Sequence, residues 1–292
     1  IKMSENNKQY KIVGSIVAYN SNQKTLERAI KSFYYSKLDN IKLCLIDNSP
    51  KKLIYIDSLL LKYPGVDYIF HGKNLGYGYA NNIAIKKYQK QTKYHVVLNP
   101  DVEFDEDVLS GLYNKLENDL NIGLAGVKIL NPDGVTQYVN KKLPKPFDVT
   151  IRLIGKKIPI IGRLIKKIFR RSRNSYKLKD LDHNKDIICP AISGCFMFFR
   201  SSALKDIGLF DPRYFMYYDD VDISRRCFAK YKVIIFNKVS VIHHWERGSY
   251  KCFGLFLSHL NSTIKYFNKW GWFIDKQRKI LNSEVEVNKL LV

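Results

Sequence analysis

Hydrophobic and polar positions follow one another along the first half of the chain in blocks that predict alternating strands and helices. Buried strands are predicted where apolar and β-branched residues run together, at 11–18, 41–46, 66–70, 94–98 and 123–127. Helices are predicted where apolar residues recur at helical spacing between them, at about 26–33, 52–62, 76–90 and 106–120. This alternation is typical of right-handed βαβ units that build a parallel sheet.

Three of these strands end in polar turns, at Tyr19-Asn20, Asp47-Asn48 and Asn99-Pro100-Asp101. Each turn alone fits an ordinary loop, because Asn and Asp are common turn formers. The ends of parallel strands share one edge of a sheet, however, and open α/β sheets bind ligands there. Together the three turns predict a polar site of nucleotide size. Neither a G-x-G-x-x-G nor a P-loop motif follows the first strand.

Asp101 is the first candidate for metal chemistry. Pro100 ends the preceding strand, so the carboxylate is presented beyond the sheet edge. A single carboxylate there suits a hard divalent cation such as Mg²⁺, which takes its other oxygens from phosphates and water.

The second half carries two further clusters of candidate residues. Strands are predicted over 189–200, 232–236 and 239–243, and a short helix over 203–210. Asp219, Asp220 and Asp222 stand at the start of another predicted helix. One acid suffices to favour a helix N-terminus, so the set could supply a general base. The last strand ends at His243-His244, which is either ordinary surface or a metal ligand.

Net charge adds an expectation about partners. The formal charge of +22 predicts an anionic partner. Nine of the twenty-two residues in 152–173 are Lys or Arg. An amphipathic helix is predicted from Pro159, and it either packs on its own domain or lies on an anionic leaflet. Its cations include Arg163, Lys166, Lys167, Arg170 and Arg171. Nucleic acid is not favoured, because no aromatic residues interleave with these charges.

The remaining features bear on location. The chain has no run of about 20 apolar residues, opens on a polar stretch, and scatters its five cysteines without metal-binding spacing. We therefore expect a cytosolic protein without disulfides. From residue 255 on, apolar residues at helical spacing and a Trp-rich, Lys-rich group suit either a core or a membrane interface.

Taken in order, these residues resemble the motifs of inverting family 2 glycosyltransferases with the GT-A fold. Within that family they look most like the bacterial rhamnosyltransferase-like group that extends O-antigen or capsular chains. The matching stretches are VAYN (17–20), IDN (46–48), NLG (74–76) with Ala80 and Asn82, LNPD (98–101), SGCFMFFR (193–200), GLFDPRYF (208–215), YYDDVDISRR (217–226) and His243-His244 with Ser249. Two positions depart from the pattern: Asn99 stands where many relatives have Asp, and Asp219 replaces a more common Glu.

The resemblance implies a Rossmann-like, mostly parallel central sheet flanked by helices, with a basic helical insertion and a C-terminal helical tail. The GT-A domain would span 1–250. Within it, 1–130 would bind the nucleotide sugar, 141–185 would be the basic insertion, and 186–250 would serve the acceptor and catalysis. Residues 251–292 would form a membrane-associating tail.

The resemblance also implies roles for individual residues. Asp220 would be the catalytic base, and Asp101 with His243 or His244 would hold Mg²⁺ or Mn²⁺. Nucleotide-sugar contacts would come from Ala18, Tyr19, Asn20, Asp47, Asn48, Asn74, Gly76, Asn82, Asn99 and Asp101. The acceptor or sugar would meet Ser193, Gly194, Asp219, Trp245 and Ser249.

The substrates follow from the same resemblance. The donor would be dTDP-rhamnose, with a UDP-sugar as the alternative, and the acceptor would be a lipid-linked oligosaccharide. The enzyme would lie on the cytoplasmic face of a bacterial plasma membrane, would bind no nucleic acid, and could form an oligomer. The rival interpretations are a nucleotidyltransferase and a non-enzymatic basic module that binds membranes.

Overall fold

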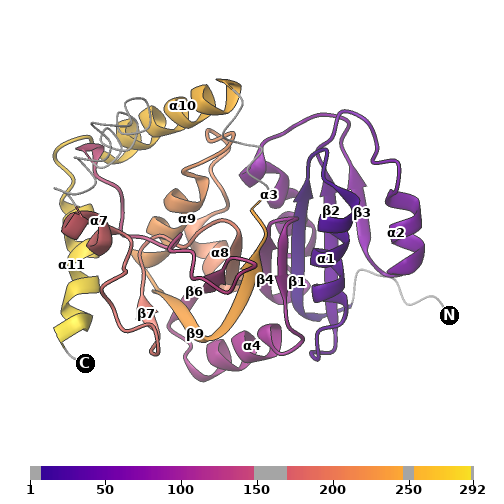
Figure 1. Ribbon diagram of the computed structural model, residues 1–292, viewed down its shortest axis with the longest axis horizontal. Coiled ribbons are helices and arrows are strands. Elements are labelled where there is room, and N and C mark those ends of the chain that lie inside the picture. Colours follow the sequence, from indigo (N-terminus) through magenta and orange to yellow (C-terminus); the bar gives the residue numbers. More distant parts are fainter. Residues whose placement is uncertain (1–7, 148–169, 246–252, 291–292) are drawn as a thin grey trace.

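A twisted sheet with helices on both faces forms the centre of the molecule (Figure 1). The computed structural model describes residues 8–147, 170–245 and 253–290. Its sheet has nine strands: eight follow the order β3-β2-β1-β4-β8-β6-β9-β5, and β7 pairs with β9. One layer of core packs α1 and α4 against the sheet, and the other packs α3, α8 and α9 against the opposite face.

The first half has the predicted alternation. Its strands are β1 (Tyr10–Ala18), β2 (Ile41–Asp47), β3 (Asp67–Phe70) and β4 (Thr92–Leu98), and neighbouring strands pair in parallel. Its helices are α1 (Gln23–Tyr34), α2 (Ile56–Lys62) and α3 (Tyr77–Tyr88). The start predicted for α2 at residue 52 is wrong. Residues 52–55 form no regular helix but an irregular segment and a turn, in which the Leu53 N–H donates to the Asp47 carboxylate at the end of β2.

Helix α1 shows how the local sequence sets an element. The Asn22 side chain accepts hydrogen bonds from the N–H groups of Lys24 and Thr25, which caps the helix start. The apolar positions at helical spacing then face the sheet and are buried; they are Leu26, Ala29, Ile30 and Phe33.

The second half is mixed in strand direction. Its elements are β5 (Val102–Phe104), α4 (Val108–Asn118), β6 (Ile122–Leu130), β7 (Ile187–Ile188), β8 (Phe196–Arg200), α8 (Ser201–Ile207), α9 (Asp219–Phe228) and β9 (Lys232–His243). Strand β8 runs antiparallel to both β4 and β6, whereas β6 and β9 are parallel.

Two strand predictions in this half are wrong. The strands expected at 232–236 and 239–243 are the single strand β9. Its register against β6 shifts after Phe236, so an irregularity absorbs the turn-like pair Asn237-Lys238. The strand expected over 189–200 is regular only in β8, at 196–200.

The basic insertion is described only at its end, where α7 spans Arg170–Tyr176. Arg170 and Arg171 are exposed on this helix. Arg163, Lys166 and Lys167 lie outside the described residues, so the predicted basic helix stays a prediction.

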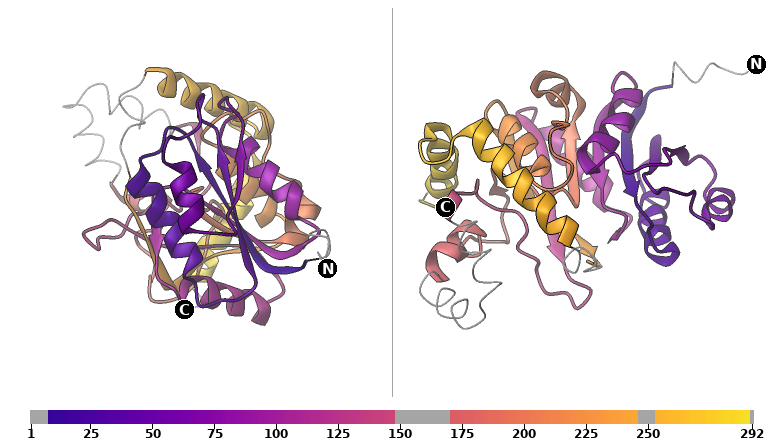
Figure 2. Two further views of the ribbon diagram at one scale, coloured as in Figure 1. Left: turned by 90° about the vertical axis from the view of Figure 1, so that its right-hand side faces the viewer. Right: turned by 90° about the horizontal axis from the view of Figure 1, so that it is seen from above.

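The C-terminal part is helical, with α10 (Phe253–Trp270) and α11 (Lys276–Leu290). Helix α10 lies above α9 in Figure 1, and the view from above in Figure 2 shows it running along that side of the molecule. Tyr266 and Phe267 of α10 and Leu281 of α11 are buried, so these helices belong to the folded body. Within the described ranges, no helix is both long and apolar enough to cross a bilayer.

Candidate active site

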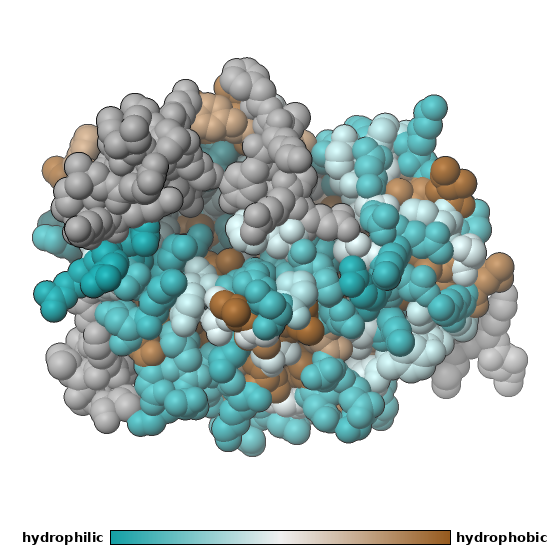
Figure 3. Space-filling model, in the orientation of Figure 1, coloured by the Kyte–Doolittle hydropathy of each residue, from teal (hydrophilic) through white to brown (hydrophobic). Residues whose placement is uncertain are grey.

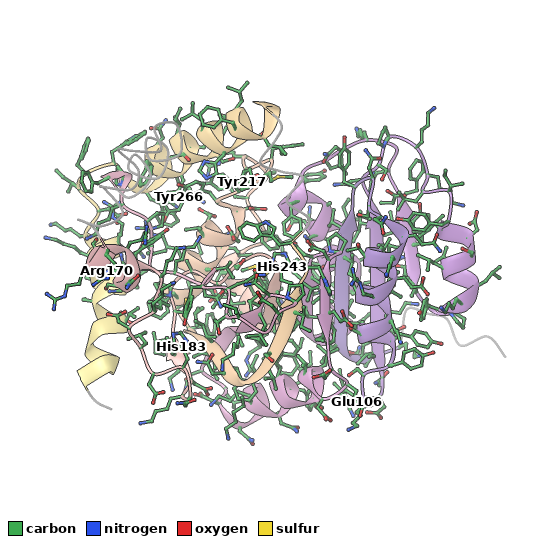
Figure 4. All side chains as sticks on the ribbon, in the orientation of Figure 1. Glu106, Arg170, His183, Tyr217, His243 and Tyr266 are labelled. Carbon is green, nitrogen blue, oxygen red and sulfur yellow. The ribbon has the colours of Figure 1, made fainter. Side chains whose placement is uncertain are left out.

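The carboxyl ends of β1 and β4 open into a cavity of about 520 Å³, with the turn after β2 in its wall. The opposite wall comes from the second half of the chain, and Figure 4 marks His243 near the centre of the molecule with Tyr217 above it. The sequence-predicted residues that line this cavity are Tyr19, Asn20, Asn48, Asn74, Gly76, Asn99, Asp101, Ser193, Gly194, Asp219, Asp220, His243 and Trp245. The structure therefore brings both predicted clusters to one space.

Asp47 and Ala18 lie behind the cavity wall. Asp47 is fully buried: one carboxylate oxygen accepts the Ser49 N–H, and the other accepts the Tyr68 hydroxyl at 2.7 Å. The Ala18 carbonyl accepts the Asn48 N–H at 2.8 Å. Both residues thus hold the 47–49 turn, and their contacts with a nucleotide stay a prediction.

Asn82 and His244 are also engaged away from the cavity. Both ends of the Asn82 amide bond the backbone of Phe210, which ties α3 to the segment before α9. His244 Nε2 lies 2.7 Å from the Glu103 carboxylate, and His244 Nδ1 lies 3.3 Å from the Arg28 guanidinium. Of the two histidines, therefore, only His243 lines the cavity. Ser249 lies outside the described residues.

Asp101 and His243 form a pair suited to a cation. His243 Nε2 lies 3.3 Å from Asp101 Oδ1. The Gln137 amide nitrogen donates to the His243 carbonyl, which leaves its oxygen 3.1 Å from His243 Nδ1. Nδ1 therefore carries the hydrogen in the neutral ring, and the Nε2 lone pair faces the carboxylate. Two electron-pair donors in this arrangement fit a shared divalent cation.

The pair does not by itself complete a metal site. Across the part of the chain that the structure describes, no group of three or more His, Cys, Asp or Glu side chains is placed to hold a metal. A cation bound by Asp101 and His243 would need further oxygens. Phosphates and water supply these in most Mg²⁺ sites.

Asp219 and Asp220 occupy the first turn of α9, in the wall of the same cavity. Asp220 accepts the Gly194 N–H at 3.0 Å and the Val221 N–H at 2.8 Å. Burial raises the pKa of Asp220, while the Gly194 hydrogen bond and the Lys141 charge oppose that rise. Burial and the neighbouring Asp220 charge raise the pKa of Asp219 to about 7. Burial thus favours a proton on the pair, and the two backbone N–H donors favour the charged form at Asp220.

The backbone before these acids adopts an unusual conformation. Tyr217 and Tyr218 have φ angles of 67° and 63°, a region that non-glycine residues rarely occupy. Helix α10 holds this segment: the Ser262 hydroxyl donates to the Met216 carbonyl at 2.8 Å, and the His259 ring lies 5.0 Å from that of Tyr217. The C-terminal part of the chain thus fixes the entry to α9.

Several cavity residues were not predicted from the sequence. The Tyr77 hydroxyl donates to the Gly194 carbonyl at 2.7 Å, so it positions the loop that binds Asp220. Next to it lies Gly76, which was predicted; it has φ +83°, and a Cβ there would come within 2.4 Å of the Phe215 carbonyl oxygen. Lys141 and His259 also line the cavity. The contacts of His259 with Tyr217 and of Tyr77 with Gly194 join positions far apart in the sequence, so no local pattern could have indicated them.

Comparison with known proteins gives a family and a fold. The family model of glycosyl transferase family 2 matches residues 15–208. Rhamnosyltransferase WbbL of Escherichia coli (strain K12) is 28% identical over 224 residues, which cover 72% of this chain and 78% of that protein. The N-acetylglucosaminyl-diphospho-decaprenol L-rhamnosyltransferase of Mycobacterium tuberculosis (strain ATCC 25618 / H37Rv) is 26% identical over 234 residues, covering 75% and 71%.

Two solved structures share the arrangement of elements. Mannosyltransferase PcManGT from Pyrobaculum calidifontis, in complex with GDP-Man and Mn²⁺, aligns over 96% of this chain and 70% of its own, with 15% identity and a TM-score of 0.59. GalNAc-T7 with UDP, GalNAc and Mn²⁺ aligns over 90% of this chain and 48% of its own, with 15% identity and a TM-score of 0.61. The GT-A type fold expected from the motifs is confirmed.

Proposed function

This chain belongs to glycosyl transferase family 2 and is a glycosyltransferase. From that premise we propose that it transfers L-rhamnose from dTDP-rhamnose to a hydroxyl of a lipid-linked oligosaccharide, and that the transfer inverts the anomeric centre. One observation carries the proposal. Asp101 with His243, and Asp220 from the start of α9, line the same cavity. A cation-binding pair and a carboxylate base at one cavity are the parts that sugar transfer from a nucleoside diphosphate requires.

The donor diphosphate would lie at the Asp101–His243 pair. A divalent cation held there, Mg²⁺ or Mn²⁺, neutralises charge on the departing diphosphate when bound. Asn99 lies beside Asp101 in the cavity wall, where its amide can donate to phosphate oxygens. Tyr19, Asn20, Asn48 and Asn74 would contact the nucleoside, and Asp47 would hold their turn in place.

Asp220 would act on the acceptor. Its carboxylate takes the proton of the acceptor hydroxyl while the hydroxyl oxygen forms a bond to the anomeric carbon. The bond between the anomeric carbon and the diphosphate oxygen breaks at the same time, and its electron pair leaves with the diphosphate. A single displacement inverts the anomeric centre, so no carboxylate nucleophile is needed. Asp219, while protonated, would donate a hydrogen bond to a sugar oxygen. Ser193, Gly194 and Trp245 would form the surrounding wall.

The acceptor class comes from the relatives and the charge. One relative is named for transfer of L-rhamnose to N-acetylglucosaminyl-diphospho-decaprenol. A lipid-linked diphosphate of this kind is anionic, which suits a protein of formal charge +22. We therefore place the enzyme at the cytoplasmic face of a bacterial plasma membrane, in the synthesis of O-antigen or capsular polysaccharide.

A UDP-sugar is the second candidate donor. GalNAc-T7, which shares the fold, was solved with UDP and GalNAc. A galactosyl, galactofuranosyl, glucosyl or N-acetylhexosaminyl donor would use the same diphosphate site. Membership of glycosyl transferase family 2 excludes the two rival interpretations, a nucleotidyltransferase and a non-enzymatic membrane-binding module.

Donor turnover tests the proposal. We expect wild-type protein with Mn²⁺ to release dTDP slowly from dTDP-rhamnose, and Asp220→Asn to lower that rate by about 10²–10⁴-fold because the base is lost. Asp105→Asn, which neutralises an exposed carboxylate outside the cavity, is the matched control and should leave the rate unchanged. If nucleotide were released only from a UDP-sugar, that sugar would replace dTDP-rhamnose as the proposed donor. Equal release rates in wild type and Asp220→Asn would contradict the role of Asp220 as the base.

A further inference from the structure

Apolar side chains are exposed along the outer side of α10 and in the connection to α11. We call this set the apolar ridge; it consists of Phe256, Leu257, Ile264, Trp272, Phe273 and Ile274. Phe273 and Ile274 are 87% and 86% exposed, at the tip between the two helices. Figure 3 shows hydrophobic surface at the upper edge of the molecule, where α10 lies in Figure 1. Water-exposed apolar side chains in this number indicate a surface with a partner.

The charged residues within the ridge segment have one sign. Residues 253–274 contain no Asp or Glu. The next acid, Asp275, is buried in an ion pair with Arg225. Lys276 and Lys279 are exposed at the start of α11, directly after the ridge tip. The ridge therefore combines apolar and cationic side chains without exposed carboxylates, which is the composition of a helix that lies in an anionic membrane interface.

The opposite side of α10 is part of the active site. His259 lines the cavity, and Ser262 holds the segment that precedes Asp219 and Asp220. One helix thus separates the cavity from the ridge. Because a helix with its side chains is about 10 Å across, a surface in contact with the ridge residues on α10 would lie about that far from the cavity.

We propose that the apolar ridge docks the enzyme on an anionic lipid bilayer, with Phe273 and Ile274 inserted between headgroups and Lys276 and Lys279 paired with lipid phosphates. The inference rests on the proposed function to the extent that the acceptor is lipid-linked. Docking by α10 would then bring the cavity close to the membrane surface, where the diphosphate group of a lipid-linked acceptor lies. A second copy of this chain is disfavoured as the partner, since a twofold interface would set the same cationic surface against itself.

Vesicle binding by the full chain tests this surface. The probes are sedimenting vesicles of phosphatidylcholine alone and of phosphatidylcholine with phosphatidylglycerol. We expect Phe273→Ser/Ile274→Ser to weaken binding to the anionic vesicles by about tenfold or more, because two inserted apolar side chains are lost. Lys276→Glu/Lys279→Glu should weaken binding to the anionic vesicles and leave binding to the neutral ones unchanged.

The matched control is Ile54→Ser/Leu61→Ser. These apolar side chains are 100% and 84% exposed, at and before α2, at the far end of the molecule from the ridge (Figure 1). They should leave vesicle binding unchanged. Equal binding by the ridge and control variants would overturn the proposal. So would a wild-type dimer that the ridge variant converts to a monomer in light scattering, because the ridge would then be a contact between copies.

Activity separates this inference from the proposed function. Without vesicles, the Phe273→Ser/Ile274→Ser variant should release dTDP from dTDP-rhamnose at the wild-type rate. Loss of vesicle binding with retained release supports the docking surface. A wild-type protein that binds vesicles through the ridge but releases no nucleotide from any donor would overturn the proposed function and leave the docking surface standing.

Discussion

Asp219 and Asp220 are adjacent in the chain, yet their surroundings separate their protonation states. Asp220 has two backbone N–H donors, and these favour its charged form. Asp219 is buried next to that charge, and its pKa is raised to about 7. The backbone that delivers them is strained at Tyr217 and Tyr218, at a cost of roughly 1–3 kcal/mol per residue. Such a cost is sustained where the surrounding structure holds a site in one geometry.

The raised pKa of Asp219 makes stability depend on pH. The unfolded chain loses this proton near pH 4, whereas the folded chain keeps it up to about pH 7. The folded state therefore binds more protons between these values, and stability falls as pH rises from about 4 to 7. We predict that Asp219→Asn removes this loss and stabilises the protein at pH 8, relative to wild type, by roughly a few kcal/mol.

Urea unfolding at pH 5 and pH 8 measures the effect. The difference between Asp219→Asn and wild type should grow with pH. Asp105→Asn, at an exposed position, should follow the wild-type profile. A constant offset between Asp219→Asn and wild type at the two pH values would show that Asp219 is already ionised in the folded protein.

At the scale of elements, a buried ion pair joins α9 to the C-terminal helices. The Arg225 guanidinium meets the Asp275 carboxylate in two hydrogen bonds, of 2.7 and 2.6 Å, with side-chain exposures of 1% and 2%. Trp270 packs over the guanidinium and donates to Asp222 at 2.8 Å. Since α9 also carries Asp220, these contacts connect the position of the proposed base to residues fifty positions later in the chain.

Removing one partner of this pair should be costly. We predict that Asp275→Ala lowers the free energy of unfolding by about 3–5 kcal/mol, because the Arg225 charge stays buried without its partner. The double variant Arg225→Met/Asp275→Leu should recover most of that loss, since it removes both charges and keeps apolar volume. Chemical denaturation compares the three proteins. A double variant as unstable as Asp275→Ala would show that packing, not the uncompensated charge, sets the cost.

Elements whose pattern is local were predictable from the sequence. The β1 strand is buried along nearly its whole length, and α1 is amphipathic, so both show in the periodicity of their residues. The prediction divided strand β9 because Asn237-Lys238 has the composition of a turn, whereas the strand continues through this pair while its register against β6 shifts. The sequence of helix α10 was compatible with either a core helix or a membrane-interface helix, because the helix has apolar residues on both its buried and its exposed sides.

The sequence predicted the part of the candidate site that lies at strand ends, but not the contacts that join distant parts of the chain. Polar residues that follow strands were found, because strand ends place them on one edge. The contacts of Tyr77 with Gly194 and of Gln137 with His243 span more than a hundred residues and leave no mark in the local sequence. For the same reason, the sequence could not show that His243 faces the cavity while His244 turns to Glu103. Which side chains complete a site depends on tertiary packing.

At the scale of the whole molecule, the cavity lies between two halves with separate tasks. The parallel half supplies Asp101 and the asparagines, and the mixed half with the C-terminal helices supplies Asp219, Asp220 and His243. A donor nucleotide with its cation would contact both halves, because His243 comes from β9 and Asp101 follows β4. Binding should therefore stabilise the molecule as a unit, and thermal unfolding can report it without turnover.

We predict that dTDP raises the melting temperature only when Mn²⁺ is present. A ligand at about 100 times its Kd adds roughly 2.7 kcal/mol of stability, which corresponds to several degrees for a protein of this size. UDP and GDP at the same concentration should give smaller shifts if thymidine is the cognate nucleoside. EDTA should abolish the shift, as should Asp101→Ala, whose own melting temperature in the absence of ligand should stay near that of wild type. A dTDP shift of equal size with EDTA, or in Asp101→Ala, would show that the nucleotide binds without the cation that Asp101 and His243 are proposed to hold.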